Sequence, residues 1–150
     1  MVETLVPSID FSPAKSQLSS LMDLVFHAHQ PYLVLRHHGK EQMLLLRPDD
    51  VLRLLSDMRI DVQAVFDEGE VTLRTPDLGV LGFGSTLDEA IDDLLSELRD
   101  YARDYFGEPD RYRGPDRTSH FGPLLRFALT PAEDQRRLLH GLESPADVVA

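Results

Sequence analysis

The sequence contains no cysteine, and it has no apolar run long enough to cross a membrane. The absence of cysteine excludes disulfides and metal sites built from thiolates. No window approaches the roughly 18 consecutive apolar residues of a membrane-spanning helix. The first residues also lack the basic and apolar segments of a signal peptide. A cytoplasmic location follows most simply from these absences.

Positive charge is also scarce, since 15 Lys and Arg face 26 Asp and Glu, which gives a net charge of -11. Residues 1–60 carry 6 cations and 7 anions, residues 61–106 carry 3 and 12, and residues 107–150 carry 6 and 7. The middle segment should therefore repel nucleic acid and attract a basic partner. Any contact with DNA has to come from the first segment.

A hydrophobic content of 42% over 150 residues is enough for a packed core and fits one domain or two small modules. Residues 1–59 and 60–106 show different orders of helix and strand patterns, and residues 107–150 follow as a linker and a C-terminal tail. The predicted fold class is α+β, with a small N-terminal α+β module, a βββα module and a helical tail.

The first module reads as helix, strand, turn, strand and helix. Ser12 and Pro13 suit the start of a helix, because serine can cap and proline needs no hydrogen bond there. Gly39 supplies the positive φ of a hairpin turn. The predicted elements are a helix from Ser12 to about Phe26, strands 32–35 and 42–46 around the turn 37–40, and a helix 48–55.

The second module reads as three strands followed by one long helix. Alternation of polar and apolar residues predicts strands near 61–66, 70–74 and 78–84. Ser85 or Thr86 should cap a helix running from Leu87 to about Phe106, whose apolar residues share one face. Residues 107–123 are rich in Gly, Pro and charge and read as a linker. A short helix is expected over 132–139.

The order of motifs between Ser8 and Leu55 resembles the Phd/YefM family of antitoxins. The segment Ser12-Pro13-Ala14-Lys15 is similar to the family's helix start, and Pro31 to Lys40 is similar to its hairpin. The resemblance implies a dimer whose paired N-terminal regions bind a palindromic operator. The residues that it assigns to DNA are Ser12, Lys15, Gln17, Arg36, His37, His38 and Lys40. The residues expected at the dimer interface are Leu21, Leu24, Leu33, Leu35, Met43 and Leu45.

Residues 62–106 look like the HicB-type antitoxin domain, a truncated ribonuclease-H-like βββα unit. Pro76-Asp77-Leu78-Gly79 resembles that family's turn, although the proline before the glycine is absent. Gly84-Ser85-Thr86-Leu87-Asp88-Glu89-Ala90 resembles the start of its helix. An ordinary structural βα unit is the alternative reading of this segment.

Two catalytic or metal-based alternatives have weak support. A two-metal nuclease needs carboxylates that converge from several elements, whereas most of those in the second module lie along one predicted helix. His27 with His29, and His37 with His38, lack the i, i+4 spacing of a zinc helix. The sequence therefore predicts no enzyme, no metal site and no cofactor.

The leading hypothesis is an antitoxin of a type II toxin–antitoxin system that represses its own operon. The resemblance implies that the toxin is an RNase, RelE-like or of the PIN-domain type, and the acidic segment would complement a basic toxin surface. The alternative is an acidic protein-binding or immunity module without DNA binding. The residues expected to contact the toxin are Tyr112, Phe121, Leu124, Leu125, Phe127 and Leu138.

Overall fold

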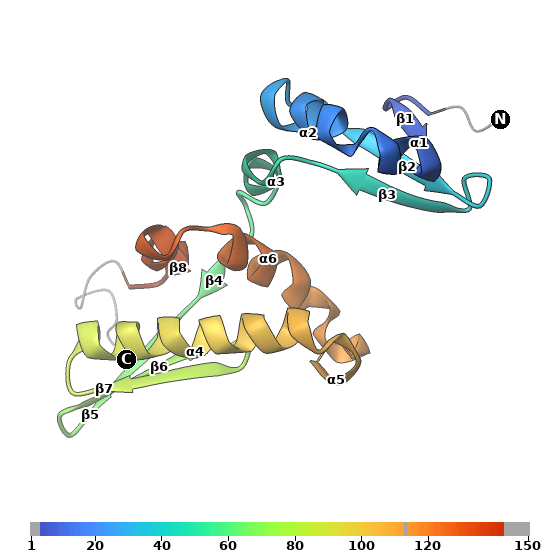
Figure 1. Cartoon of the computed structure of the whole chain (residues 1–150). Coiled ribbons are helices and arrows are strands. Elements are labelled where there is room, and N and C mark those ends of the chain that lie inside the picture. The colour runs from blue at the N-terminus through green and yellow to red at the C-terminus, as the bar shows by residue number, and fades with distance from the viewer. Residues whose placement is uncertain (1–3, 113, 143–150) are drawn as a thin grey trace. The chain divides into compact units, whose positions relative to one another are not determined.

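The computed structural model describes residues 4–112 and 114–142 and has a mixed α+β fold. The chain divides into two compact units, Met1–Leu54 (unit 1) and Leu55–Ala150 (unit 2) (Figure 1). The predicted boundary followed residue 59. The earlier division has a local reason, because Arg126 of unit 2 donates a hydrogen bond to the carbonyl of Met58. Residues 143–150 of the expected tail lie outside the described part.

Unit 1 combines a three-stranded sheet with three short helices. β1 pairs in parallel with β2, and β2 pairs antiparallel with β3. The sheet and α1 and α2 enclose a small core. The elements of unit 1 are β1 (Ser8–Asp10), α1 (Phe11–Ser16), α2 (Leu18–His27), β2 (Tyr32–Arg36), β3 (Glu41–Leu45) and α3 (Pro48–Leu54).

The first helical region differs from the prediction of one continuous helix that begins at Ser12. Asp10 occupies the N-cap position of α1, and Ser12 lies inside the helix. The helix is interrupted at Gln17, whose φ of -112° and ψ of 23° are not helical. The Gln17 carbonyl still accepts from Leu21 at 3.0 Å, so the chain re-enters α2 at once. The interruption turns Lys15 into a last-turn residue of α1.

The predicted hairpin is confirmed as β2 and β3, which are joined by a turn over residues 37–40. Its tip has an unusual backbone, because His37 and His38 have φ values of 53° and 57° and precede Gly39 at 81°. Such left-handed conformations are common for glycine and uncommon for other residues. The two histidines are thus held in a strained, exposed loop.

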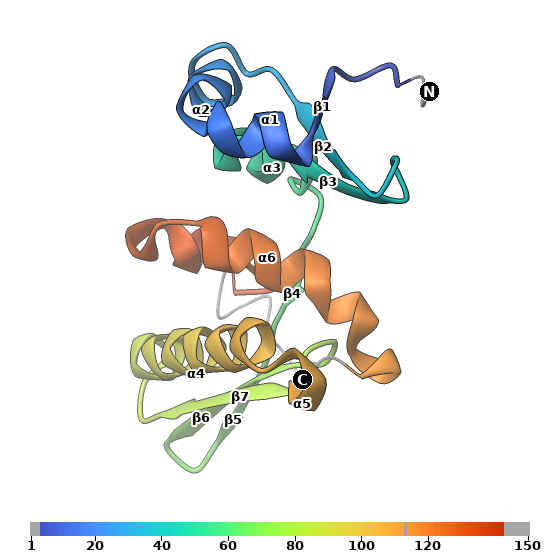
Figure 2. The ribbon, with the colours of Figure 1, turned by 45° about the vertical axis from the view of Figure 1, so that its right-hand side comes forward.

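Unit 2 is built around an antiparallel sheet in the order β5–β6–β7 that α4 covers (Figures 1 and 2). A separate parallel pair joins β4 and β8. Its strands are β4 (Ile60–Asp61), β5 (Gln63–Asp67), β6 (Glu70–Thr75), β7 (Val80–Gly84) and β8 (Leu139–His140). Its helices are α4 (Leu87–Gly107), α5 (Pro109–Tyr112), η1 (Pro115–His120), α6 (Phe121–Leu129) and η2 (Ala132–Leu138), with η marking 3₁₀ helices.

Helix α4 forms where the sequence predicted it. The Thr86 side chain caps the helix by accepting from the Glu89 N–H at 3.1 Å, and the Glu89 carboxylate accepts from the Ser85 N–H at 2.8 Å. One face of α4 is buried, and Leu94 and Leu98 are fully inaccessible. The helix can lie close to β7 because a Cβ at Gly82 would fall 2.6 Å from the Leu94 Cβ.

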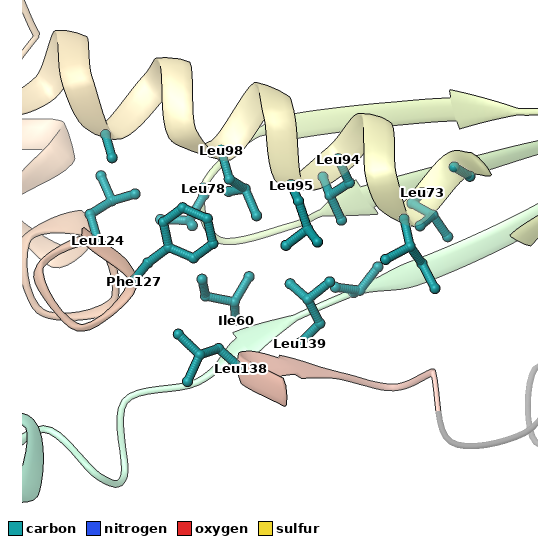
Figure 3. Packing of buried hydrophobic residues seen from close by; sticks show 14 of the residues in the cluster. Ile60, Leu73, Leu78, Leu94, Leu95, Leu98, Leu124, Phe127, Leu138 and Leu139 are labelled. Carbon is teal, nitrogen blue, oxygen red and sulfur yellow. The ribbon is translucent and has the colours of Figure 1, made fainter. Parts of the chain in front are cut away.

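For residues 107–142 the predicted linker is wrong, because α5, η1 and the start of α6 lie within residues 107–123, whereas the short helix expected over 132–139 is present as η2. The segment folds back, and Leu124 and Phe127 of α6 point into the core between α4 and β4 (Figure 3). β8 pairs with β4, in register Ile60 with Leu139. The amphipathic pattern of this segment is therefore satisfied within unit 2.

Candidate functional site

The basic hairpin tip of unit 1 is partly neutralised by an acid of its own. Arg36 donates to Glu41 through Nε at 2.8 Å and also through Nη2, directly across the hairpin. The His37 Nε2 lies 3.7 Å from the other oxygen of the same carboxylate. Glu41 is a component that the sequence reasoning missed, although its position opposite Arg36 followed from the predicted turn.

The remaining residues assigned to DNA lie on the surface of unit 1. Ser12, Lys15, Gln17, His38 and Lys40 are exposed. Among the described residues, Lys15 and Lys40 have no ion-pair partner. Lys15, which belongs to the segment similar to the family's helix start, lies in the last turn of the six-residue α1.

The residues expected at the dimer interface separate into three groups. Leu21 and Leu35 are buried within unit 1, and Leu33 and Leu45 are half-buried. Leu24 and Met43 are exposed, at 43% and 58%. Met43 also lines a groove of about 320 Å³ together with Phe11 and Val34.

An exposed apolar stripe on α2 was not predicted. Leu18, Met22 and Phe26 recur every four residues and are 51%, 60% and 49% exposed. Residues at this spacing share one face of a helix. In the sequence, Leu18 and Met22 share the helical spacing of Leu21 and Val25, and the structure buries only the latter two.

The expected toxin-contact residues lie mostly inside unit 2. Leu124, Phe127 and Leu138 belong to its core, at 0%, 1% and 7% exposure. Tyr112 and Leu125 are half-buried, and Phe121 is 44% exposed. Of the six, Phe121 alone is an exposed residue.

A groove of about 670 Å³ lies along β7 and the adjacent flank of α4. Asp93, Glu97, Asp100 and Asp104 line it from α4. The sequence places most acids of this module along one helix, and their spacing of three or four residues indicates a shared face. Only the fold places that face beside β7.

Tyr101 and Arg117 close one end of this groove. Burial raises the pKa of Tyr101 above its ordinary value of 10.0, and the neighbouring Arg117 guanidinium opposes that rise. The Tyr101 hydroxyl lies 2.7 Å from the His120 Nδ1. The neutral phenol therefore persists at this end of the groove at physiological pH.

No helix in the described part of the chain is both long enough and apolar enough to span a bilayer. The same residues contain no cluster of three or more His, Asp or Glu arranged to hold a metal ion.

Unit 1 thus exposes apolar residues on α2 and β3, and unit 2 has an open groove lined by acids of α4. The family model PHD_like, described as antitoxin of toxin–antitoxin, RelE/RelB, TA system, matches residues 5–140. The chain belongs to this family and is an antitoxin of a toxin–antitoxin system.

A solved structure shares the fold. It is the crystal structure of a protein from Syntrophomonas wolfei subsp. wolfei described as the antitoxin part of a toxin/antitoxin system. The two chains are 20% identical, and the alignment covers 90% of this chain and 97% of that one with a TM-score of 0.79. Comparison with curated proteins gives no match.

Proposed function

We propose that this antitoxin divides its work between its two units. Unit 1 dimerises and binds operator DNA, which represses the operon from within the cytoplasm, and unit 2 binds and neutralises a basic RNase toxin of the RelE-like or PIN-domain type. The single observation that carries this division is charge. Acids outnumber Lys and Arg by one in unit 1 and by ten in unit 2.

We also propose that unit 1 is a Phd/YefM-like module and that unit 2 contains a HicB-like module. The hairpin β2–β3 beside α1 and α2 supports the first assignment. The consecutive order β5, β6, β7 and α4 supports the second, since it is a βββα unit. Residues 109–142 are an addition to that unit, because α6 completes its core.

Dimerisation is supported by the apolar surface of unit 1. Leu18, Met22 and Phe26 on α2 and Met43 on β3 are each about half exposed or more. Apolar side chains gathered in this number on so small a unit are typical of an interaction surface. A dimer would cover such residues and would also double the cations that face DNA.

In this proposal Lys15, His38 and Lys40 contact the DNA directly. Arg36 contributes only where it leaves its ion pair with Glu41. Because Glu41 accepts from Nε and Nη2 of Arg36, a phosphate competes with that carboxylate for Arg36. Each phosphate that a cation neutralises steepens the salt dependence of binding. A dimer with four free lysines should therefore bind DNA measurably where a monomer would not.

A mobility-shift assay on the DNA upstream of this gene tests the DNA-binding role. Lys15→Ala/Lys40→Ala should weaken binding about tenfold or more and flatten its salt dependence. Glu41→Gln should strengthen binding by freeing Arg36. Arg103→Ala/Arg111→Ala, which removes two exposed cations of unit 2, is the matched control. Equal binding by the lysine double variant and the wild type would refute the proposal.

The second candidate function is an acidic protein-binding module without DNA binding. The Arg36–Glu41 pair favours it, because this pair removes one cation from the proposed DNA surface. No detectable DNA binding by the wild type, or weak binding that is equal in all three variants and independent of salt, would support this alternative. Co-purification with the product of the neighbouring gene tests the toxin partner that both candidates share.

A further inference from the structure

Strand β7 forms an open edge of the sheet in unit 2. It pairs with β6 along one side, and the sheet order places no described strand on the other. The Val80 N–H donates to the Thr75 Oγ1 at 2.9 Å, so the backbone of Val80 faces β6. Because this direction alternates along an antiparallel strand, Leu81 and Phe83 direct their N–H and C=O groups away from β6.

The outward groups of β7 are only partly satisfied. The Phe83 N–H donates to the Asp93 Oδ2 at 2.8 Å. The structure gives no hydrogen-bond partner on this edge for the Leu81 N–H within the described residues. An exposed row of backbone donors and acceptors is a template for an added strand.

The side chains beside this edge are apolar on one face of the sheet. Leu81 and Phe83 are 45% and 56% exposed, and the register places Phe83 in line with Thr72 and Val65. This is the face opposite α4, because Val71, Leu73 and Gly82 point toward the helix and are buried. A strand added to β7 would find apolar neighbours on this side.

The other face of an added strand would meet the acidic row of α4. Asp100 is paired with Arg103 at 2.8 Å, whereas Glu97 and Asp104 have no ion-pair partner among the described residues. From Asp93 to Asp104 the helix rises by about 16 Å. The five residues of β7 span about 17 Å, so the row of carboxylates runs the length of the open edge.

Charge decides what can occupy this edge. A second copy of the chain would bring an identical row of carboxylates against the first, and nucleic acid would be repelled for the same reason. Successive side chains of a strand point to opposite faces. An occupant therefore needs cations toward α4 and apolar side chains toward Leu81 and Phe83.

We propose that an extended segment of the toxin, with alternating basic and apolar residues, adds to β7 as a fourth strand. Its Lys or Arg side chains bind Glu97 and Asp104, and its apolar side chains cover Leu81 and Phe83. This inference rests on the proposed function, since it requires that unit 2 binds a toxin.

The charge part is tested by the dissociation constant of the full chain for the toxin encoded beside it, measured by calorimetry at fixed salt. Glu97→Lys/Asp104→Lys should weaken binding about thirtyfold or more, because each substitution opposes a cation. Asp92→Lys/Glu133→Lys makes the same charge change at exposed positions outside the groove and should weaken binding no more than about threefold. Circular dichroism confirms that both variants fold.

The backbone part is tested by Leu81→Pro against Leu81→Thr. Both remove the leucine side chain, but only proline removes the outward N–H, and an edge strand tolerates proline at such a position. The proline variant should bind the toxin about tenfold more weakly than the threonine variant. In the wild type, the Leu81 amide should gain protection from hydrogen exchange only in the complex.

The outcomes separate this inference from the function on which it rests. Equal weakening by the groove pair and the control pair, or no protection of the Leu81 amide, would overturn strand addition while leaving the antitoxin's toxin binding intact. A wild-type chain that binds no toxin would overturn the proposed function together with the inference.

Discussion

Each unit has a three-stranded sheet, but the two units bury very different numbers of apolar residues. In unit 1 the buried cluster consists of Ala14, Leu21 and Val34. In unit 2 a single cluster extends from Ile60 to Leu139, and Leu73, Leu94, Leu98 and Leu124 within it are completely inaccessible. The difference lies in what covers each sheet.

Unit 2 has one helix long enough to cover one face of its sheet and a second helix that packs against the first. α4 runs for 21 residues, and α6 packs against it (Figure 3). Unit 1 has only the 6 residues of α1 and the 10 of α2 for this purpose. Unit 1 is also the smaller unit, and a small domain buries a smaller share of its surface than a larger domain does. From this comparison we expect unit 2 to be stable by itself and the proposed dimer to add stability to unit 1.

The largest expected effect tests whether α6 is part of the unit 2 core. Phe127→Ala should lower the free energy of unfolding by about 3–5 kcal/mol, because it leaves a cavity in a packed interior. Phe121→Ala, on the same helix but 44% exposed, should cost less than about 1.5 kcal/mol. Urea unfolding of both variants gives the two values. Similar losses would mean that α6 is not held in the core.

A smaller effect is expected where the sheet and helix of unit 2 approach each other. Gly82→Ala places a methyl group 2.6 Å from the Leu94 Cβ and 2.7 Å from the Ala90 carbonyl. The clash should cost about 1–3 kcal/mol. Gly107→Ala meets no atom within 4 Å and should stabilise α4 by less than about 1 kcal/mol. Thermal unfolding measured by calorimetry distinguishes these opposite signs.

Unit 1 should respond to surface substitutions in a way that unit 2 does not. Met43→Lys should change the stability of the monomer by less than about 0.5 kcal/mol but abolish association, because it puts a charge into an apolar interface. Val65→Lys, at a residue of unit 2 with a similar exposure of 54%, should leave the mass unchanged. Sedimentation over a range of concentrations measures the mass of the wild type and of both variants. A wild-type chain that is monomeric throughout would remove the contrast between the units.

The smallest effect concerns alkaline pH. Because burial raises the pKa of Tyr101, the folded state holds this proton more tightly than the unfolded state. The contribution of protonated Tyr101 to the free energy of unfolding is complete below pH 10.0. It is lost as the pH rises through the raised pKa. Tyr101→Phe should therefore show a shallower loss of stability above pH 10.0. Tyr32→Phe in unit 1 is the matched control, and identical profiles for the two variants would contradict the expectation.

Local patterns predicted most elements of both units. The hairpin of unit 1, the three strands of unit 2 and the capped helix after Thr86 lie close to their expected positions. Each depends on neighbours in sequence: a turn residue, an alternation or a cap. The interruption at Gln17 was missed, because a break that keeps the helical direction leaves the apolar spacing almost unchanged.

The candidate sites were less predictable, because they depend on residues that meet only after folding. Arg36 reads as a free cation until the register places Glu41 opposite it. The acids of α4 read as a solvated face until β7 presents an open edge beside them. In both cases the chemistry of the side chain was visible and its neighbour was not.

By itself, the sequence determined the α+β class, the uneven distribution of charge and the family-like order of the N-terminal motifs. Only the tertiary structure decided which apolar faces belong to this chain's own core. Leu124 and Phe127 repeat at a spacing that requires burial, and the same spacing suits a partner's surface or an internal one. They are internal, whereas Met22 and Met43 remain outside. A hydrophobic pattern predicts that a helix face is buried. Whether it is buried in the chain's own core depends on which elements pack against that face in the folded structure.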